Sequence, residues 1–340
     1  MTTRPSNRRS DVVVRPLVER DLDQADLVFR TAFGTFMGAP EPEKFFGDVD
    51  FVRTRWRADP TAALAAELDG ELVGSNLVTN WGSVGFFGPL TVRPDCWDRG
   101  IAKRMLEPTM ELFASWKTRQ VGLLTFAESP KHVGLYQSFG FWPRYLIAAM
   151  AMPVVAPVGA PPGPPEVAPG RAGAPGRAVA YTRFSEVASH DRAGLTSSVR
   201  ELTSAVFEGL DVTREIDAVL DQKLGETVLI SDASGLQAVA VCHIGPGTEA
   251  GSDTCYVKFG AARPGRKAAR SFGQLIDACQ DLAATSGVSV LSAGVNFGRE
   301  RAYAALRQRG FRVQFQGIAM HRGNEPGYDK PNCYVIDDWR

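Results

Sequence analysis

Residues Leu90–Met105, LTVRPDCWDRGIAKRM, join the end of an apolar strand to the start of a helix through a short polar turn. Gly100 and Ala102 are small, so a ligand can approach the backbone closely there. We predict that the amides of residues 97–102 face an anion in front of the helix, where the helix dipole is positive. Basic side chains surround the turn: Arg93, Arg99, Lys103 and Arg104. A pyrophosphate is the natural ligand, although an ordinary strand-to-helix loop has a similar sequence.

A second stretch, Ser129–Phe141, SPKHVGLYQSFGF, follows the next predicted strand. Its pattern indicates a short helix that carries Tyr136 and stops at Gly140, a residue typical of the position just after a helix end. On this stretch alone, Tyr136 is either a core aromatic residue or a functional phenol.

In this order and spacing, the two stretches resemble the GNAT superfamily of N-acetyltransferases. The family's V-x-P and Q/R-x-x-G-x-G/A read here Val92-Arg93-Pro94 and Trp97-Asp98-Arg99-Gly100-Ile101-Ala102. The family's N-x-x-A-x-x-L-Y-x-x-x-G-F reads here Ser129, His132, Leu135, Tyr136, Gly140 and Phe141. Three positions depart from the family pattern: Trp97, Ser129 and His132. Because such an anion site works through backbone amides, Trp97 need not abolish binding, and Ser129 can still cap the helix.

The resemblance implies transfer of an acetyl group from the cosubstrate acetyl-CoA to an amine. The residues implied to bind acetyl-CoA are Leu90, Thr91, Val92, Trp97, Asp98, Arg99, Gly100, Ile101, Ala102, Lys103, Ser129 and Tyr136. The Leu90 amide is expected to stabilise the oxyanion, the Val92 amide to hold the pantetheine arm, and Tyr136 to protonate the leaving thiolate. The arm is expected to enter where strand Val84–Val92 splays from strand Val121–Phe126.

The base that deprotonates the amine is less evident. Some family members carry a glutamate on the strand before the turn, but Gly85-Phe86-Phe87-Gly88 holds no carboxylate. Glu128 is the best remaining candidate, and a solvated loop carboxylate is the alternative. We expect the acceptor site to include the aromatic loop Phe33–Phe51 and the second domain. The C-terminal tail either frays or folds back over the first domain and supplies charge for a cationic amine.

Together with the order of strands and helices, the resemblance implies an α+β fold of two tandem GNAT-like domains, each a mixed, mostly antiparallel sheet flanked by helices. In the first half, Asp69-Gly70 indicates a hairpin between two strands. The second half repeats the same order of strands and helices, which indicates an internal duplication. The predicted segments are a flexible N-terminus at 1–11, a domain with the acetyl-CoA site at 12–152, a Pro/Gly-rich linker at 153–177, a degenerate domain at 178–322 and a tail at 323–340.

The second half keeps the later motif as Arg299-Glu300-Arg301-Ala302-Tyr303-Ala304-Ala305-Leu306 before Gly310-Phe311, but Leu306 stands where the tyrosine belongs. In its loop, Arg263–Arg270, Arg270 replaces the close-packing glycine. A long side chain there obstructs the approach of a ligand to the backbone. We therefore expect the second half to bind no acetyl-CoA of its own.

The composition argues against two classes of protein. The 340 residues carry 38 Lys plus Arg and 38 Asp plus Glu, so the net charge is zero, whereas nucleic-acid-binding proteins are usually basic and disordered chains usually carry a high net charge. No long apolar run predicts a membrane span or a secretory signal. The five cysteines and four histidines are scattered, which favours a reducing cytoplasm and argues against a metal site. We expect a monomer that is a pseudo-dimer of its domains, or a homodimer.

Three functional hypotheses follow. The first is an N-acetyltransferase that acts on the primary amine of a small molecule by direct attack, with Tyr136 as general acid. The second is a non-catalytic CoA-binding or interaction protein on the same scaffold, which the missing strand carboxylate allows. The third is an acyltransferase that uses a longer acyl-CoA.

Overall fold

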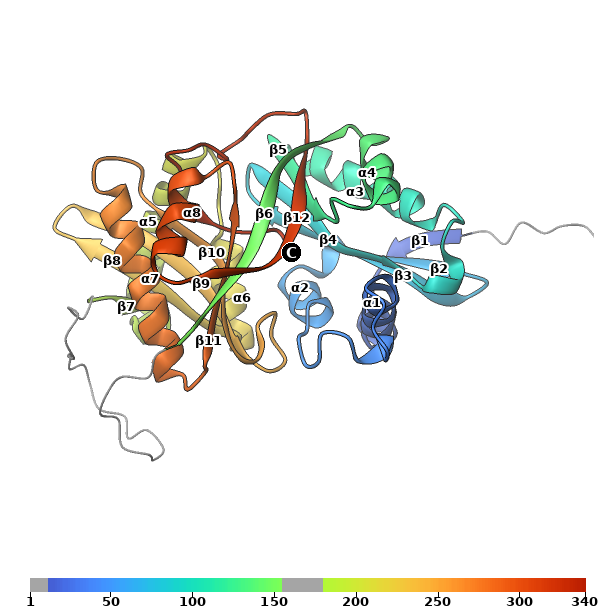
Figure 1. Ribbon diagram of the computed structural model, residues 1–340, viewed down its shortest axis with the longest axis horizontal. Coiled ribbons are helices and arrows are strands. Elements are labelled where there is room, and N and C mark those ends of the chain that lie inside the picture. The colour runs from blue at the N-terminus through green and yellow to red at the C-terminus, as the bar shows by residue number, and fades with distance from the viewer. Residues whose placement is uncertain (1–11, 155–179) are drawn as a thin grey trace, which may run out of the picture. The chain divides into compact units, whose positions relative to one another are not determined.

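The computed structural model of the protein describes residues 12–154 and 180–340 (Figure 1). Unit 1 comprises the described residues up to Gly47, Phe51–Thr79 and Phe86–Lys117, and unit 2 comprises Asp48–Asp50, Asn80–Gly85 and the described residues from Thr118 to Arg340. The predicted N-terminus at 1–11 and nearly all of the predicted linker at 153–177 lie outside the described residues.

Unit 1 is a four-stranded sheet in the order β1-β2-β3-β4 with helices on its faces. Its elements are β1 (Val12–Pro16), α1 (Leu22–Phe36), α2 (Val52–Ala58), β2 (Ala63–Leu68), β3 (Glu71–Trp81), β4 (Val84–Val92) and α3 (Ile101–Trp116). The β3 and β4 ends at Asn80–Gly85 group with unit 2. Both Asp69 and Gly70 have positive φ, so the predicted hairpin between β2 and β3 is confirmed.

Packing in unit 1 follows from the apolar pattern of α3 and the strands beneath it. Ile101 and Met105 lie one turn apart on the helix and are buried against Val73 and Val92. α3 thus covers one face of the sheet, while α1 and α2 pack together on the other (Figure 1). This packing fixes the start of α3 beside the end of β4.

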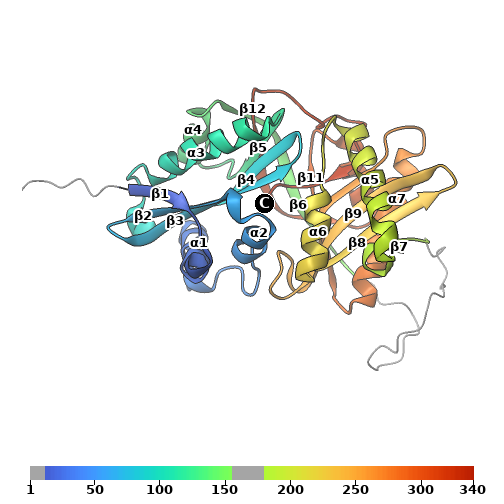
Figure 2. The same ribbon diagram turned by 180° about the vertical axis from the view of Figure 1, so that it is seen from behind.

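Unit 2 contains the rest of the described chain. Its elements are β5 (Gln120–Thr125), α4 (Pro130–Gln137), β6 (Phe141–Pro153), β7 (Thr182–Arg183), α5 (Ser189–Val206), α6 (Thr213–Gln222), β8 (Gly225–Asp232), β9 (Gly235–Gly245), β10 (Gly251–Ala262), α7 (Ala268–Thr285), β11 (Val290–Asn296), α8 (Glu300–Gln308), β12 (Arg312–Arg322) and β13 (Val335–Ile336). The strand order is β5-β12-β6-β11-β10-β9-β8-β7, and β13 pairs with β10 off this path. α7 and α8 cover one face of the β8–β11 sheet, and α5 and α6 cover the other (Figures 1 and 2).

The two halves of the sequence exchange their last strands within unit 2. β6, from the first half, pairs with β11 of the second half, while β12, from the second half, pairs with β5 of the first. β6 and β12 also pair with each other along most of their length, side by side in both ribbon views (Figures 1 and 2). The sheet of the second half is therefore completed by a strand that precedes residue 154.

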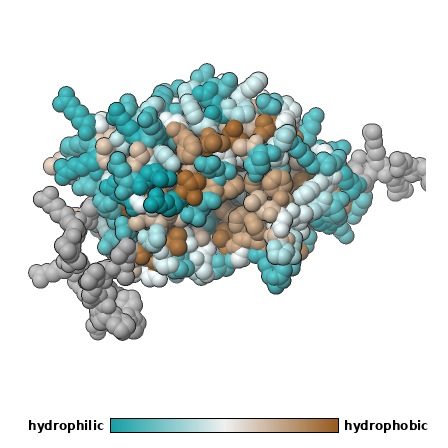
Figure 3. Space-filling view, in the orientation of Figure 1, coloured by the Kyte–Doolittle hydropathy of each residue, from teal (hydrophilic) through white to brown (hydrophobic). Residues whose placement is uncertain are grey.

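The predicted α+β class, with mixed and mostly antiparallel sheets, is confirmed. Three large apolar side chains of β6 and β12 are exposed: Trp142, Leu146 and Phe315. On the face shown in Figure 3, hydrophobic residues (brown) lie among hydrophilic ones (teal). Among the described residues, none of the helices has the length and apolar character needed to cross a bilayer.

Candidate active site

The turn between β4 and α3 is held in place by three side chains that pack beneath it. Cys96 and Ile101 are buried in one core cluster with Val92. Trp97 packs against the same cluster, and its indole Nε1 donates to the Val92 carbonyl at 2.7 Å. This bond closes the turn onto the end of β4. Trp97, which departs from the family pattern, therefore has a structural contact that fixes the turn.

The exposed part of the turn consists of Asp98, Arg99 and Gly100. Asp98 and Gly100 have φ of 63° and 77°, in the left-handed region that favours glycine. A Cβ placed on Gly100 meets no atom within 4 Å, so the space beside this residue is open. The absence of a side chain at Gly100 thus leaves the backbone accessible to a ligand.

The start of α3 has the electrostatic character of an anion site. Gly100 caps the helix without a side-chain hydrogen bond, and the first turn holds no acidic residue. The first amides of a helix have no partner within it, and the dipole adds positive potential there. Lys103 is exposed, whereas the Arg104 guanidinium donates to the Val12 carbonyl at 2.8 Å. Of the predicted residues from Trp97 to Lys103, Asp98, Arg99, Gly100 and Lys103 are therefore exposed on unit 1, whereas Ile101 anchors the turn in the core.

The end of β4 is fixed from inside unit 1. Thr91 is buried, and its hydroxyl lies 3.3 Å from that of Ser75, so its side chain is occupied within the unit. Leu90 is half-buried against the core cluster below the turn.

Sequence reasoning missed Arg55 on α2, whose guanidinium donates to the Gly88 carbonyl at 2.6 Å. Nothing in the sequence around Arg55 distinguishes it from other arginines of an amphipathic helix.

The remaining predicted residues lie in unit 2, on α4 or just before it. Ser129 caps this helix, and its Oγ accepts from the His132 amide at 3.5 Å, as predicted. Tyr136 is buried on the same helix, and burial raises the pKa of its phenol well above the usual value of about 10. The phenol is therefore protonated throughout the neutral range. Glu128, just before the helix, is exposed.

Sequence reasoning treated His132 only as a departure from the family pattern. Its ring is half-buried on the first turn of α4, 6.0 Å between centroids from Phe126. Burial, followed by the charge of Lys131, lowers the pKa of His132, while Glu128 opposes this effect. A neutral imidazole at pH 7 can accept a proton. The signal in the sequence was a titratable residue in place of the family's alanine.

The aromatic segment after α1 folds as one cluster in unit 1. Phe29 stacks on Phe46 with 5.2 Å between ring centroids, and Phe33 and Phe51 contact the same rings. The Arg30 guanidinium donates to the carbonyls of Phe45 and Gly47, which fixes the loop to the helix. Phe46 remains more than a third exposed and is the member open to a ligand.

The C-terminal tail is neither frayed nor available as a source of negative charge. Val335–Ile336 pair with β10, and both tail carboxylates are buried in unit 2. Asp337 pairs with Arg299, and Asp338 pairs with Arg340 and accepts from the Tyr256 hydroxyl. The expectation that these aspartates lie free for a cationic amine is wrong, because each is neutralised within unit 2.

Two substitutions in the second half are the basis for predicting that it binds no acetyl-CoA. Leu306, at the position of the motif tyrosine, is buried in the core of unit 2 and offers no hydroxyl. Arg270 is exposed on the first turn of α7. Within residues 12–154 and 180–340, no group of three or more His, Cys, Asp or Glu side chains is arranged to hold a metal ion.

A comparison with models of protein families found one match. Residues 28–141 match the family model described as Acetyltransferase (GNAT) family. No curated protein matches the chain significantly.

Several solved structures share the fold at low sequence identity. A protein of Pyrococcus horikoshii, provisionally described as an acetyltransferase, has a TM-score of 0.63 at 14% identity, covering 96% of this chain and 95% of its own. A GCN5-related N-acetyltransferase from Sphaerobacter thermophilus has a TM-score of 0.52 at 16% identity, covering 91% of this chain and 95% of its own. The glucosamine N-acetyltransferase region of a fungal GH3 β-N-acetylglucosaminidase has a TM-score of 0.60 at 10% identity, covering 92% of this chain and 38% of the fungal one. These likenesses show the fold, and residues 28–141 of the chain match the acetyltransferase (GNAT) family model.

Proposed function

We propose that the protein is an N-acetyltransferase that moves the acetyl group of acetyl-CoA to the primary amine of a small molecule. The observation that carries the proposal is the turn at residues 97–102. Buried anchors hold it from below, its exposed backbone includes Gly100, and the first turn of α3 carries no acidic residue. A turn of this kind, in a domain that matches the family model, suits the pyrophosphate of an acyl-CoA.

The chemistry requires one bond exchange. The neutral amine nitrogen attacks the thioester carbonyl carbon, the C–N bond forms, and the C–S bond breaks. The Leu90 amide is proposed to donate to the carbonyl oxygen as negative charge develops on it. Tyr136, protonated at neutral pH, gives its proton to the departing thiolate, and the proton from the amine leaves through a base.

Two residues compete for the role of base. Glu128 was the candidate from sequence, and its side chain is exposed to solvent. His132 is half-buried, and its lowered pKa keeps the imidazole neutral and able to accept a proton. We therefore include His132 in the proposed machinery beside Glu128. In either case the proton passes directly or through water to solvent.

One observation favours a second candidate function, a non-catalytic CoA-binding protein. The strand that carries the glutamate in some relatives reads Gly85-Phe86-Phe87-Gly88, and Phe86 and Phe87 are buried. This part of β4 therefore offers no carboxylate to an amine. An acyltransferase for a longer acyl-CoA is the third possibility.

A screen of amine acceptors separates these functions. Thiol release from acetyl-CoA is followed with amino acids, aminoglycosides, polyamines and amino sugars, with the Tyr136→Phe variant as matched control. The proposal expects at least one amine to accelerate release in the parent and much less in the variant. Binding of CoA without release on any amine supports the non-catalytic function, and release only from longer acyl-CoA thioesters supports the third.

A further inference from the structure

β10 and β11 of unit 2 pair over only part of their length. Their parallel ladder runs from Thr254–Val290 to Val257–Ala293, yet β10 continues to Ala262 and β11 to Asn296. Beyond the ladder the two strands therefore separate. The C-terminal strand β13 enters this opening and pairs antiparallel with β10, and it contacts β11 as well.

The residues that β13 contacts have counterparts in the first half. In each half, an Arg-Pro dipeptide directly follows a strand: Arg93-Pro94 follows β4, and Arg263-Pro264 follows β10. When the two halves are aligned on this dipeptide, Val92 corresponds to Ala262 and Leu90 to Gly260. Gly260 pairs with Ile336, and the Ala262 amide donates to the Tyr334 carbonyl at 3.0 Å. In unit 2, Tyr334 of the tail therefore accepts from the Ala262 amide. This amide corresponds to the Val92 amide, which is proposed to hold pantetheine in the first half.

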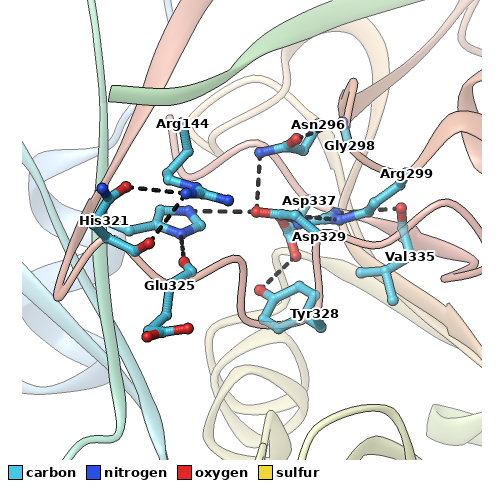
Figure 4. A network of polar contacts seen from close by, with 11 residues as sticks. Arg144, Asn296, Gly298, Arg299, His321, Glu325, Tyr328, Asp329, Val335 and Asp337 are labelled. Carbon is cyan, nitrogen blue, oxygen red and sulfur yellow. Dashed lines mark hydrogen bonds and ion pairs between the residues drawn. The ribbon is translucent and has the colours of Figure 1, made fainter. Parts of the chain in front are cut away.

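The helix after β11 also contacts the tail. Arg299 stands before α8 at the motif position that Ser129 occupies before α4. Its guanidinium donates to the Val335 carbonyl at 3.3 Å and to Asp337 and Asp329 at 2.8 and 2.7 Å (Figure 4). Tyr328 also donates to Asp337, so the tail is held by buried charge-assisted bonds.

The floor of the opening is shaped to admit the tail closely. A Cβ on Gly294 of β11 would lie 2.0 Å from the Asp338 carboxylate, so only glycine fits there. On the other side, the Tyr256 hydroxyl of β10 donates to Asp338 at 2.8 Å. The tail therefore packs between β10 and β11 and contacts residues of both strands.

We propose that the opening between β10 and β11 is a second, vestigial acyl-donor cleft. Residues Tyr334–Ile336 occupy the place that the pantetheine arm takes along the corresponding strand of the first half. An extended peptide can replace pantetheine because both present amide groups along a narrow chain. The inference rests on the proposed function, which assigns the end of β4 to the acyl donor.

The test removes the tail and asks what the opening binds. The chain shortened to residues 1–333 and the full chain are compared by equilibrium dialysis against pantetheine. The shortened chain is expected to take up one more equivalent than the full chain. The peptide of residues 334–340 should displace that equivalent, whereas a scrambled peptide should not. Equal uptake by both folded chains, or peptide and pantetheine bound together, would overturn the proposal.

A second design covers the case in which the shortened chain does not fold. A protease site is inserted after Gly323, which is exposed, and the chain is cut only after it has folded. Pantetheine should increase the fraction of the 324–340 fragment that is released, measured by size exclusion, and an unchanged fraction would contradict the inference. Acetyl transfer by the uncut parent chain is measured in parallel. Loss of transfer with pantetheine uptake intact contradicts only the proposed function, and the converse contradicts only this inference.

Discussion

Arg299 Nη2 donates to Asp337 Oδ1 at 2.8 Å, and both side chains are shielded from solvent. Asp329 accepts from Nε of the same guanidinium at 2.7 Å and lies 3.3 Å from His321 Nε2, as Figure 4 shows. One buried cation thus joins the start of α8 to two separate points of the C-terminal segment. Such a group is costly to leave without its partners.

Replacing this arginine should strongly destabilise unit 2. Arg299→Met leaves Asp329 and Asp337 buried without their cation, and we expect a loss of about 3–5 kcal/mol in unfolding free energy. The double variant Arg299→Met with Asp337→Asn should recover part of the loss. Urea titration measures both, and a single variant as stable as the parent would refute the role of the pair.

The same variant should show an altered pH dependence. Burial already raises the pKa of Asp337, and loss of Arg299 raises it further. A carboxyl with a raised folded pKa binds its proton more tightly in the folded state, so stability falls as pH rises through that range. The deficit of Arg299→Met is therefore expected to be smaller at pH 5 than at pH 7. A deficit independent of pH would show that lost packing, not charge, is responsible.

Gly100→Glu should abolish CoA binding while the fold is retained. The carboxylate would stand beside the pyrophosphate, and we expect affinity to fall more than tenfold, or about 1.4 kcal/mol. Gly100→Asn is the matched control, because asparagine tolerates positive φ and adds no charge. Calorimetry should find CoA bound by the control and not by the glutamate variant. Equal affinities would remove this turn from the binding site.

One CoA should bind per chain. In the second half, β13 fills the opening between β10 and β11, and the buried Leu306 stands at the position of the motif tyrosine. Calorimetric titration of the parent chain gives the ratio directly. Two equivalents would show that the second half is not degenerate.

Tyr136→Phe should lower kcat with little change in the KM for acetyl-CoA. Proton donation to the thiolate matters mainly in the transition state, and general acid catalysis contributes roughly 10²–10⁴-fold. The ring is kept, so α4 should pack as before and Tm should change little. A variant that turns over at the parental rate would leave Tyr136 as a packing residue only.

The pH profile of kcat/KM should identify the base. If His132 accepts the proton, activity falls as pH drops through its pKa, which burial holds below the usual 6.5. Removal of the imidazole in His132→Ala should lower activity and abolish this limb, whereas Glu128→Gln should leave it in place. The opposite pattern would assign the role to Glu128.

Much of the fold was predictable because it depends on local signals. Asp69-Gly70 specified a hairpin through its backbone preferences, and the apolar spacing of α3 placed Ile101 and Met105 inward. The turn at Gly100 was predictable for the same reason, since a left-handed residue before a helix calls for glycine. These features need only neighbouring residues to form.

Partnerships between distant segments could not be read from the sequence. Alternation marks β6 and β12 as strands, but it does not say that each completes the sheet of the other half. The tail carried the right residues, Asp337 and Asp338, yet their partners Arg299 and Tyr256 lie far away in the chain. The sequence shows the negative charge of the tail, but it does not show the buried partners that neutralise this charge.

The exchange of β6 and β12 also has a consequence during synthesis. β6 ends at Pro153, but β11, on one of its edges, ends only at Asn296. At about 5–20 residues per second, the roughly 140 residues between these points occupy the ribosome for about 7–30 s. Throughout that interval the nascent first half presents a strand with free backbone groups, the type of edge that recruits other chains. Ribosome-associated chaperones that shield such an edge should therefore raise the yield of this protein more than that of a single-domain relative.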